Sequence, residues 1–206
     1  GGQKLAVSAA VMILVLTAPR LEWESRTGPR LPRSGGAVAA AHGGRIYLFG
    51  GTGRAAGVST EIYDPARDAW TRGADMPTRR ESPCVAVVEG KIYLIGGTDP
   101  TVAKGDYHKG QLATTEEYDP ATDTWKSRAP MKEKRDVAAV GVVDGRIYML
   151  GGMYGEMNLD HPENRSTVEV YDPKADLWTL LPSRMPIPTR AMAYATVGKK
   201  IYLFGG

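Results

Sequence analysis

The phrase Arg45-Ile-Tyr-Leu-Phe-Gly-Gly51 decides the fold, because the chain repeats it three more times with few changes. The copies are Lys91-Ile-Tyr-Leu-Ile-Gly-Gly97, Arg146-Ile-Tyr-Met-Leu-Gly-Gly152 and Lys200-Ile-Tyr-Leu-Phe-Gly-Gly206. The second glycine of the pair therefore recurs after 46, 55 and 54 residues. A repeat of this length is one supersecondary unit that cannot bury its apolar face alone, so we expect neighbouring units to stack.

One unit, between Thr78 and Pro130, shows what is repeated. Four of its segments have the length and the β-branched or alternating composition of strands: residues 82–88, 91–95, 114–118 and 124–126. Between the last two, Asp119-Pro120 opens a segment suited to a type I turn. Four short antiparallel strands per unit are typical of a β-propeller blade.

Two further elements recur once per unit. Tyr-Asp-Pro stands at residues 63–65, 118–120 and 171–173, and tryptophan follows each proline by five residues, at Trp70, Trp125 and Trp178. Trp23 stands in the same place before the first glycine pair, but Leu16-Thr17-Ala18 replaces Tyr-Asp-Pro there. These spaced elements predict three complete units and parts of others.

Glycine pair, Tyr-Asp-Pro and tryptophan in this order resemble the kelch repeat, over about residues 21–206. The resemblance implies an all-β chain, a β-propeller of four-stranded antiparallel kelch blades. Complete blades are expected at about 33–74, 78–128 and 135–181, with a partial blade at 190–206. The chain would then be a piece of a larger ring, similar to secreted bacterial kelch proteins.

Residues that recur once per blade are expected to be scaffold. The glycine pairs permit positive φ and close approach between blades. The tyrosine and tryptophan rings bury large areas between blades. The aspartates of Tyr-Asp-Pro are expected to brace the turns. We therefore assign none of them a catalytic role.

One repeated residue type has two interpretations. Before the first strand of each blade stands an arginine: Arg33, Arg80, Arg135 and Arg190. In a closed ring these side chains would surround one mouth of the central channel and could grip a ligand carboxylate. The alternative is that each arginine pairs with a carboxylate or carbonyl of its own or a neighbouring blade. Both interpretations stay open at this point.

The loops between the second and third strands differ most between blades. The loop at 98–113 carries Tyr107 and His108, and the loop at 153–166 carries Tyr154 and His161. Variable loops on a rigid frame commonly bind ligands, so we predict these four residues in the binding site. No ligand spacing supports a metal site, and no cofactor is expected.

Composition limits the possible functions. The net charge is only +3 and no run of Lys or Arg exists, which argues against nucleic acid. Cys84 is the only cysteine, so an internal disulfide is excluded. Among apolar neighbours it is interpreted as a buried small side chain.

The first twenty residues allow two interpretations. Lys4 precedes an apolar run from Leu5 to Leu16, which predicts a signal peptide over residues 1–20 and a secreted or periplasmic protein. The run is too short for a stable membrane span. Alternatively, these residues are diverged propeller strands, and the protein is cytoplasmic.

The favoured function is a non-enzymatic binding scaffold for a protein, such as an acidic peptide. The alternative is a mutarotase- or epimerase-like kelch propeller that acts on a carboxylated sugar such as N-acetylneuraminate, with Asp106, His108, Glu156 or His161 as proton carriers. Open edges would require further blades or a second copy. A small four-bladed ring, in which Val11–Leu16 and Leu21–Glu24 complete the last blade, is another route to closure.

Overall fold

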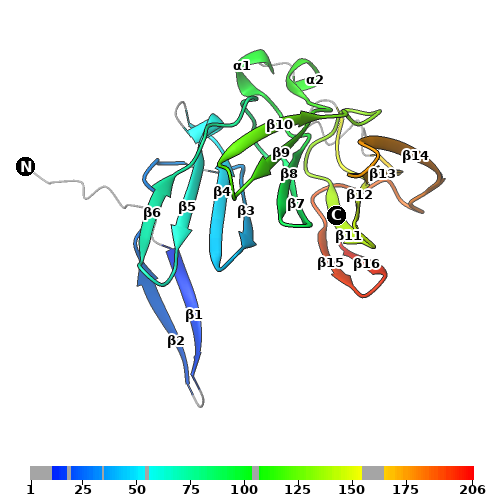
Figure 1. Ribbon diagram of the computed structural model, residues 1–206. Helices are drawn as coiled ribbons and strands as arrows, with labels where there is room; N and C mark the ends of the chain where they lie inside the picture. Colours follow the sequence, from blue (N-terminus) through cyan, green and yellow to red (C-terminus); the bar gives the residue numbers. More distant parts are fainter. Residues whose placement is uncertain (1–10, 18–19, 34, 54–55, 104–106, 155–164) are drawn as a thin grey trace, which may run out of the picture.

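The computed structural model describes residues 11–17, 20–33, 35–53, 56–103, 107–154 and 165–206. Its strands form three four-stranded antiparallel sheets with a two-stranded sheet at each end of the series (Figure 1). Each four-stranded sheet has its strands in sequence order, as in a propeller blade. The predicted all-β fold, with three complete blades and partial flanking strands, is confirmed.

The bounds of the elements follow from the repeat. Blade 1 consists of β3 (Ala37–His42), β4 (Arg45–Gly50), β5 (Thr60–Asp64) and β6 (Ala69–Arg72). Blade 2 consists of β7 (Cys84–Val88), β8 (Lys91–Ile95), β9 (Thr115–Asp119) and β10 (Thr124–Arg128). Blade 3 consists of β11 (Ala139–Val143), β12 (Arg146–Leu150), β13 (Thr167–Asp172) and β14 (Leu177–Arg184).

The remaining elements lie at the ends and in the loops. The two-stranded sheets are β1 (Val11–Thr17) with β2 (Arg20–Arg26), and β15 (Ala193–Val197) with β16 (Lys200–Phe204). A 3-10 turn, η1 (Ala56–Val58), follows β4. Two short helices that the sequence did not predict, α1 (Pro100–Ala103) and α2 (Tyr107–Gly110), occupy the loop after β8.

Aromatic rings fill the interfaces between blades, as predicted. Within blade 2, Ile92 pairs with Tyr118, and Tyr118 pairs with Trp125, so these side chains form one row across three strands. That row packs on the preceding blade, because the Tyr118 ring centroid lies 5.9 Å from those of Tyr47 and Phe49. Phe49 and Tyr118 are fully buried.

The glycine pairs have the positive φ angles and the close contacts between blades that the repeat predicts. Gly96 and Gly97 have φ of +63° and +89°, which disfavour a side chain. A Cβ on Gly96 would collide with the carbonyl oxygen of Arg135, and the Gly97 amide donates a hydrogen bond to that oxygen at 3.0 Å. The pair therefore lets the end of one blade touch the start of the next.

A second contact joins the outer strands of consecutive blades. In blade 2, Asp123 accepts hydrogen bonds from the Tyr118 hydroxyl at 2.6 Å and from the Ala74 amide of blade 1 at 2.7 Å. The Trp125 indole donates to the Ala74 carbonyl at 2.9 Å. This Tyr–Asp–Trp contact sits beside the predicted Asx turn, in which Asp119 accepts from the Ala121 amide at 3.0 Å.

The same contact joins blade 1 to the segment that follows β2. Asp68 accepts from the Thr27 amide at 3.0 Å, and the Trp70 indole donates to the Thr27 carbonyl at 2.7 Å. Thr27 therefore occupies the place that Ala74 has before blade 2. The closure that would bring β1 and β2 beside β16 is not formed, since the described strands β1 and β2 pair only with each other.

Candidate binding face

The arginines that precede each blade are held by glutamates of the third strand. Arg80 Nη2 lies 2.9 Å from Glu116 Oε2, and Arg80 Nη1 donates to the Gly96 carbonyl at 2.9 Å. Neither ionic side chain is more than 3% exposed. The glutamate is two residues before the tyrosine of Tyr-Asp-Pro, where strand alternation points both side chains to the same face. We call this Arg–Glu–glycine unit the arginine bracket.

Blades 1 and 3 repeat the bracket. Arg33 forms an ion pair with Glu61 and donates to the Gly50 carbonyl at 2.8 Å. Arg135 lies 2.7 Å from Glu169 and donates to the Gly151 carbonyl at 2.9 Å. Burial lowers the pKa of each of these arginines, and the facing glutamate opposes that shift.

These contacts match the alternative interpretation of the arginines, pairing within their own blade. Arg80 and Arg135 are fully buried, so neither presents a nitrogen to solvent. Arg33, Arg80 and Arg135 are thus paired within their own blades, and ligand binding by these arginines stays a prediction. The pairing arises because each third strand supplies a buried carboxylate at the right register to meet its guanidinium.

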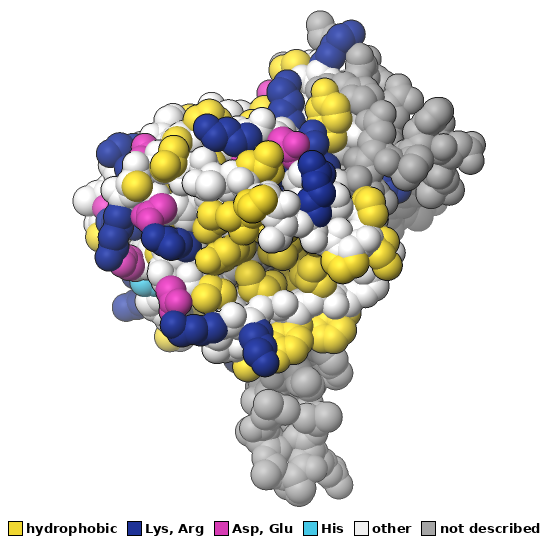
Figure 2. Space-filling view, turned by 90° about the vertical axis from the view of Figure 1, so that its right-hand side faces the viewer, with side chains coloured by type: hydrophobic (Ala, Val, Ile, Leu, Met, Phe, Trp, Pro, Cys, Tyr) yellow, Lys and Arg dark blue, Asp and Glu magenta, His cyan; other side chains and the backbone are white. Residues whose placement is uncertain are grey.

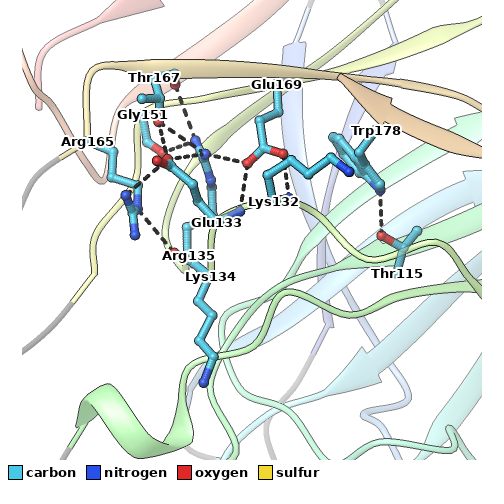
Figure 3. A network of polar contacts seen from close by, with 10 residues as sticks. All are labelled: Thr115, Lys132, Glu133, Lys134, Arg135, Gly151, Arg165, Thr167, Glu169 and Trp178. Atoms are coloured by element: carbon cyan, nitrogen blue, oxygen red, sulfur yellow. Dashed lines mark hydrogen bonds and ion pairs between the residues drawn. The ribbon is translucent and has the colours of Figure 1, made fainter. Parts of the chain in front are cut away.

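In blade 3 the bracket extends to the base of a long loop (Figure 3). Glu133 Oε2 lies 3.0 Å from Arg135 Nη2 and 3.0 Å from Arg165 Nη1. The hydroxyl of Thr167 donates to the same Glu133 oxygen at 2.6 Å. Arg165 also stacks over the Tyr154 ring, with its Cζ 4.8 Å from the centroid. The two ends of the 153–166 loop are thus joined through the bracket.

The bases of the two long loops meet. Gln111, which ends the loop carrying α1 and α2, donates from Nε2 to the Met153 carbonyl and to Asp136 Oδ1, both at 3.2 Å. Asp136 also accepts from the Thr98 hydroxyl at 2.7 Å. Burial raises the pKa of Asp136, although the bonds from Thr98 and Gln111 partly oppose the shift. The base of a loop of blade 2 therefore contacts the base of a loop of blade 3.

The predicted loop residues are placed as follows. Tyr154 is exposed beside the loop base. Tyr107 and His108 lie in α2, but their side chains are outside the described set. His161 lies outside the described residues. Of the four predicted binding residues in the loops, the structure therefore positions the side chain of Tyr154.

Arg190 differs from the other three arginines. It is half-buried, and its Nη1 approaches the Met153 sulfur at 2.6 Å. Among the residues that the structure describes, no carboxylate lies within ion-pair distance of it. It stands before β15 and β16, which lack a third strand in the described sheet.

Other chemistry is limited within the described ranges. No group of three His, Cys, Asp or Glu side chains there could hold a metal ion. Burial raises the pKa of the Cys84 thiol to about 12, and its Sγ lies 3.2 Å from the Ala138 carbonyl oxygen. Cys84 is therefore a buried small side chain, as predicted, and not an activated nucleophile. None of the described helices is long and apolar enough to cross a membrane.

Two sets of scaffold residues were missed by sequence reasoning. One is the bracket glutamates, Glu61, Glu116 and Glu169; the other is the aspartates five residues after each tyrosine, Asp68, Asp123 and Asp176. Both recur at fixed distances from Tyr-Asp-Pro. Aligning the units on that tyrosine would have revealed them.

Comparisons with known proteins agree with the repeat. The family model described as the KLHDC2/KLHL20/DRC7 Kelch-repeats domain matches residues 1–206. Kelch-like protein 25 of Xenopus tropicalis is 31% identical over 82% of this chain and 28% of its own length. Kelch-like protein terF of Aspergillus terreus is 32% identical over 82% of this chain and 38% of its own.

One further relative and one solved structure extend the comparison. Kelch repeat and BTB domain-containing protein 12 of Homo sapiens is 34% identical over 70% of this chain and 24% of its own length. The chain thus spans well under half of each of these three curated relatives. The solved structure of YjhT shares the fold, with a TM-score of 0.70 and 18% identity over 84% of this chain and 58% of its own. The chain belongs to the kelch-repeat family.

Proposed function

We propose that this chain is a non-enzymatic binding platform whose ligand face is formed by the two long loops, residues 98–113 and 153–166. The observation that carries the proposal is the hydrogen bond from Gln111 to the Met153 carbonyl, which joins the bases of these loops. Variable loops on a rigid frame are where propellers and other scaffolds place binding residues.

The frame beneath this face is held together by buried ion pairs. The arginine brackets of blades 2 and 3 are buried, and Glu133 ties the Arg135 bracket to Arg165 at the loop base. A loop held at its base loses less conformational entropy on binding. The brackets therefore act as supports of the face, not as its ligand contacts.

The charges around the face suit an acidic segment of a protein partner. Lys109, Lys132 and Lys134 are exposed, and Arg165 is about one-fifth exposed beside the exposed Tyr154. Tyrosine and arginine are enriched among residues that dominate binding energy. Cations in this position would also speed encounter with an acidic partner.

An array of acidic twelve-residue peptides, rich in Asp and Glu around one aromatic residue, tests this proposal. Peptides that bind the chain are expected to lose most of their affinity with Tyr154→Ala and with Lys134→Glu. Arg72→Ala is the matched control, because Arg72 is an exposed arginine paired with Asp75 on blade 1. Equal binding by all four proteins would contradict the loop face.

The carboxylated sugar remains the alternative ligand, but it has less support. Its carboxylate was expected to contact the entrance arginines, and Arg80 and Arg135 are already committed to Glu116 and Glu169. NMR exchange measurements on N-acetylneuraminate test it directly. An anomerisation rate that rises with protein concentration would favour the enzyme over the scaffold.

We further propose that β1 and β2 are the outer half of a preceding blade. The contacts of Thr27 with Asp68 and Trp70 support this, since Ala74 makes the same contacts with the next blade. A signal peptide over residues 1–20 and a secreted or periplasmic location stay predictions. Sequencing the N-terminus of the natural protein decides between the half-blade and the signal peptide. Cleavage near residue 20 would remove β1 and contradict the half-blade.

A further inference from the structure

Blade 3 carries an ion pair that departs from the repeat. Its acid, Glu133, stands two residues before the bracket arginine Arg135, whereas Leu31 and Thr78 stand at that place in blades 1 and 2. Neither of those two residues has a carboxylate, yet the brackets of blades 1 and 2 both form. The bracket therefore does not require an acid at this position, and Glu133 is an addition specific to blade 3.

The base of the pair, Arg165, is equally specific to blade 3. The Arg165 amide donates to the Gly152 carbonyl at 2.8 Å, and in blade 2 the equivalent bond runs from the Leu112 amide to the Gly97 carbonyl at 2.9 Å. An apolar side chain thus stands in blade 2 where blade 3 has a guanidinium. Glu133 and Arg165 depart from the repeat together, at the base of the 153–166 loop.

Two cations and two anions balance one another at this loop base. Arg135 pairs with Glu169 at 2.7 Å, as in the other brackets. Glu133 lies 3.0 Å from both Arg135 and Arg165. The Lys134 side chain extends away from Glu133 (Figure 3). The charge of Arg165 is therefore balanced by Glu133, although 20% of the Arg165 side chain stays exposed.

The surroundings of this pair are cationic. Lys109, Lys132 and Lys134 are exposed on the same side of the molecule. In Figure 2, Lys and Arg side chains predominate over Asp and Glu at the upper end of the view, the end that carries the long loops in Figure 1. Cations attract carboxylates and phosphates alike. Discrimination between these two ligands therefore needs a repulsive element, and Glu133 supplies a negative charge in contact with Arg165.

The repulsion depends on the charge of the ligand. An oxyanion held by the exposed part of Arg165 would share one guanidinium with Glu133, and charges within about 4–6 Å of one another interact strongly. A phosphoryl group carries about −1.5 to −2 charge at pH 7, whereas a carboxylate carries a single negative charge. Because the Coulomb energy is proportional to the ligand charge, Glu133 disfavours a phosphate more than a carboxylate.

We propose that Glu133 is a specificity-determining residue of the loop face, which lets Arg165 accept a Glu or Asp side chain and disfavours a phosphorylated residue at the same place. This inference rests on the proposed function, because it takes the loop face as the binding site. The ligand class is thereby an unphosphorylated acidic segment, and phosphorylation of that segment at the position held by Arg165 weakens its binding.

A labelled twelve-residue peptide of Asp, Glu and one tyrosine tests the inference. Each acidic residue is replaced in turn by phosphoserine, and fluorescence anisotropy with the whole chain gives the dissociation constant of each form. At one position or more, Glu133→Gln should shift the ratio of the two constants toward phosphoserine by about fourfold or more, the effect of one additional charge at about 5 Å in water. Glu89→Gln is the matched control, because Glu89 is an exposed carboxylate in the turn between β7 and β8, paired with Lys174, and should leave the ratio unchanged.

The ratio separates charge selection from a purely structural role. A loosened loop base would change both dissociation constants by the same factor, and Glu133→Asp, which keeps the charge, should keep the wild-type ratio. Equal ratios for the wild type and Glu133→Gln would overturn this inference and leave the loop face standing. Tighter binding of every phosphoserine form by the wild type would overturn it as well. Failure of all peptides to bind the wild type would instead contradict the proposed function, and this inference with it.

Discussion

Replacing Arg135 with methionine removes the charge of one arginine bracket but keeps most of the apolar stem. The guanidinium now donates to Glu169 at 2.7 Å, to the Gly151 carbonyl at 2.9 Å and to the Thr167 hydroxyl at 3.1 Å. Removing one partner of a buried ion pair costs about 3–5 kcal/mol. Glu169 would still accept the amide of Lys132 at 2.7 Å. We therefore expect a loss at the lower end of this range, about 3 kcal/mol in the free energy of unfolding.

Urea unfolding followed by tryptophan fluorescence measures this loss as a shift of the midpoint at constant slope. The control is Arg146→Met, because Arg146 pairs with Asp172 at the surface, with side chains 56% and 31% exposed. That change should cost under about 1 kcal/mol. Adding Glu169→Gln to Arg135→Met should recover part of the loss, because a neutral amide oxygen no longer needs a cation. Equal costs for the Arg135 and Arg146 variants would refute the bracket as a main support of the fold.

Two further predictions concern the contacts between blades. Gly96→Ala should lower the free energy of unfolding by about 2 kcal/mol or more, since φ is +63° and the new Cβ would collide with the Arg135 carbonyl oxygen. Urea unfolding measures this loss. An unchanged free energy of unfolding would contradict the close approach of the two blades. Tyr118→Phe should cost about 1 kcal/mol through the lost bond to Asp123. Burial raises the pKa of Tyr118 and Tyr171 above the ordinary value of 10.0, so the folded state favours the neutral phenol. The stability that this preference contributes is fully present below pH 10.0, and it is lost as the pH rises through the pKa of each tyrosine in the folded state. Urea midpoints at rising alkaline pH should fall more steeply for the wild type than for Tyr118→Phe, and parallel curves would refute this cause.

The sequence predicted the blades well because their signals are local and repeated. Positive φ at a glycine pair and an Asx turn after Tyr-Asp-Pro depend on residues next to one another in the chain. The strands found at Lys91–Ile95 and Thr124–Arg128 lie where alternation and turn residues place them. The short helices α1 and α2 were not predicted, because four-residue helices carry too little periodicity to identify.

The arginines show where local signals end. Their spacing identified a repeated role, but it allowed both a ligand carboxylate and a carboxylate of the same blade. The choice depends on Glu116 facing Arg80 across the blade, although the two residues are 36 positions apart in the chain. Burial of both groups then makes their pairing far more favourable than leaving either charge unpaired.

By itself, then, the sequence determined the blade, its strands and its turns, since each depends on neighbouring residues repeated at fixed intervals. Only the tertiary structure decided which distant side chains pair with one another. It buried Arg80 and Arg135 against carboxylates of their own blades and joined the bases of the two long loops through Gln111. Those outcomes depend on contacts between distant segments, which become defined only when the blades stack against one another.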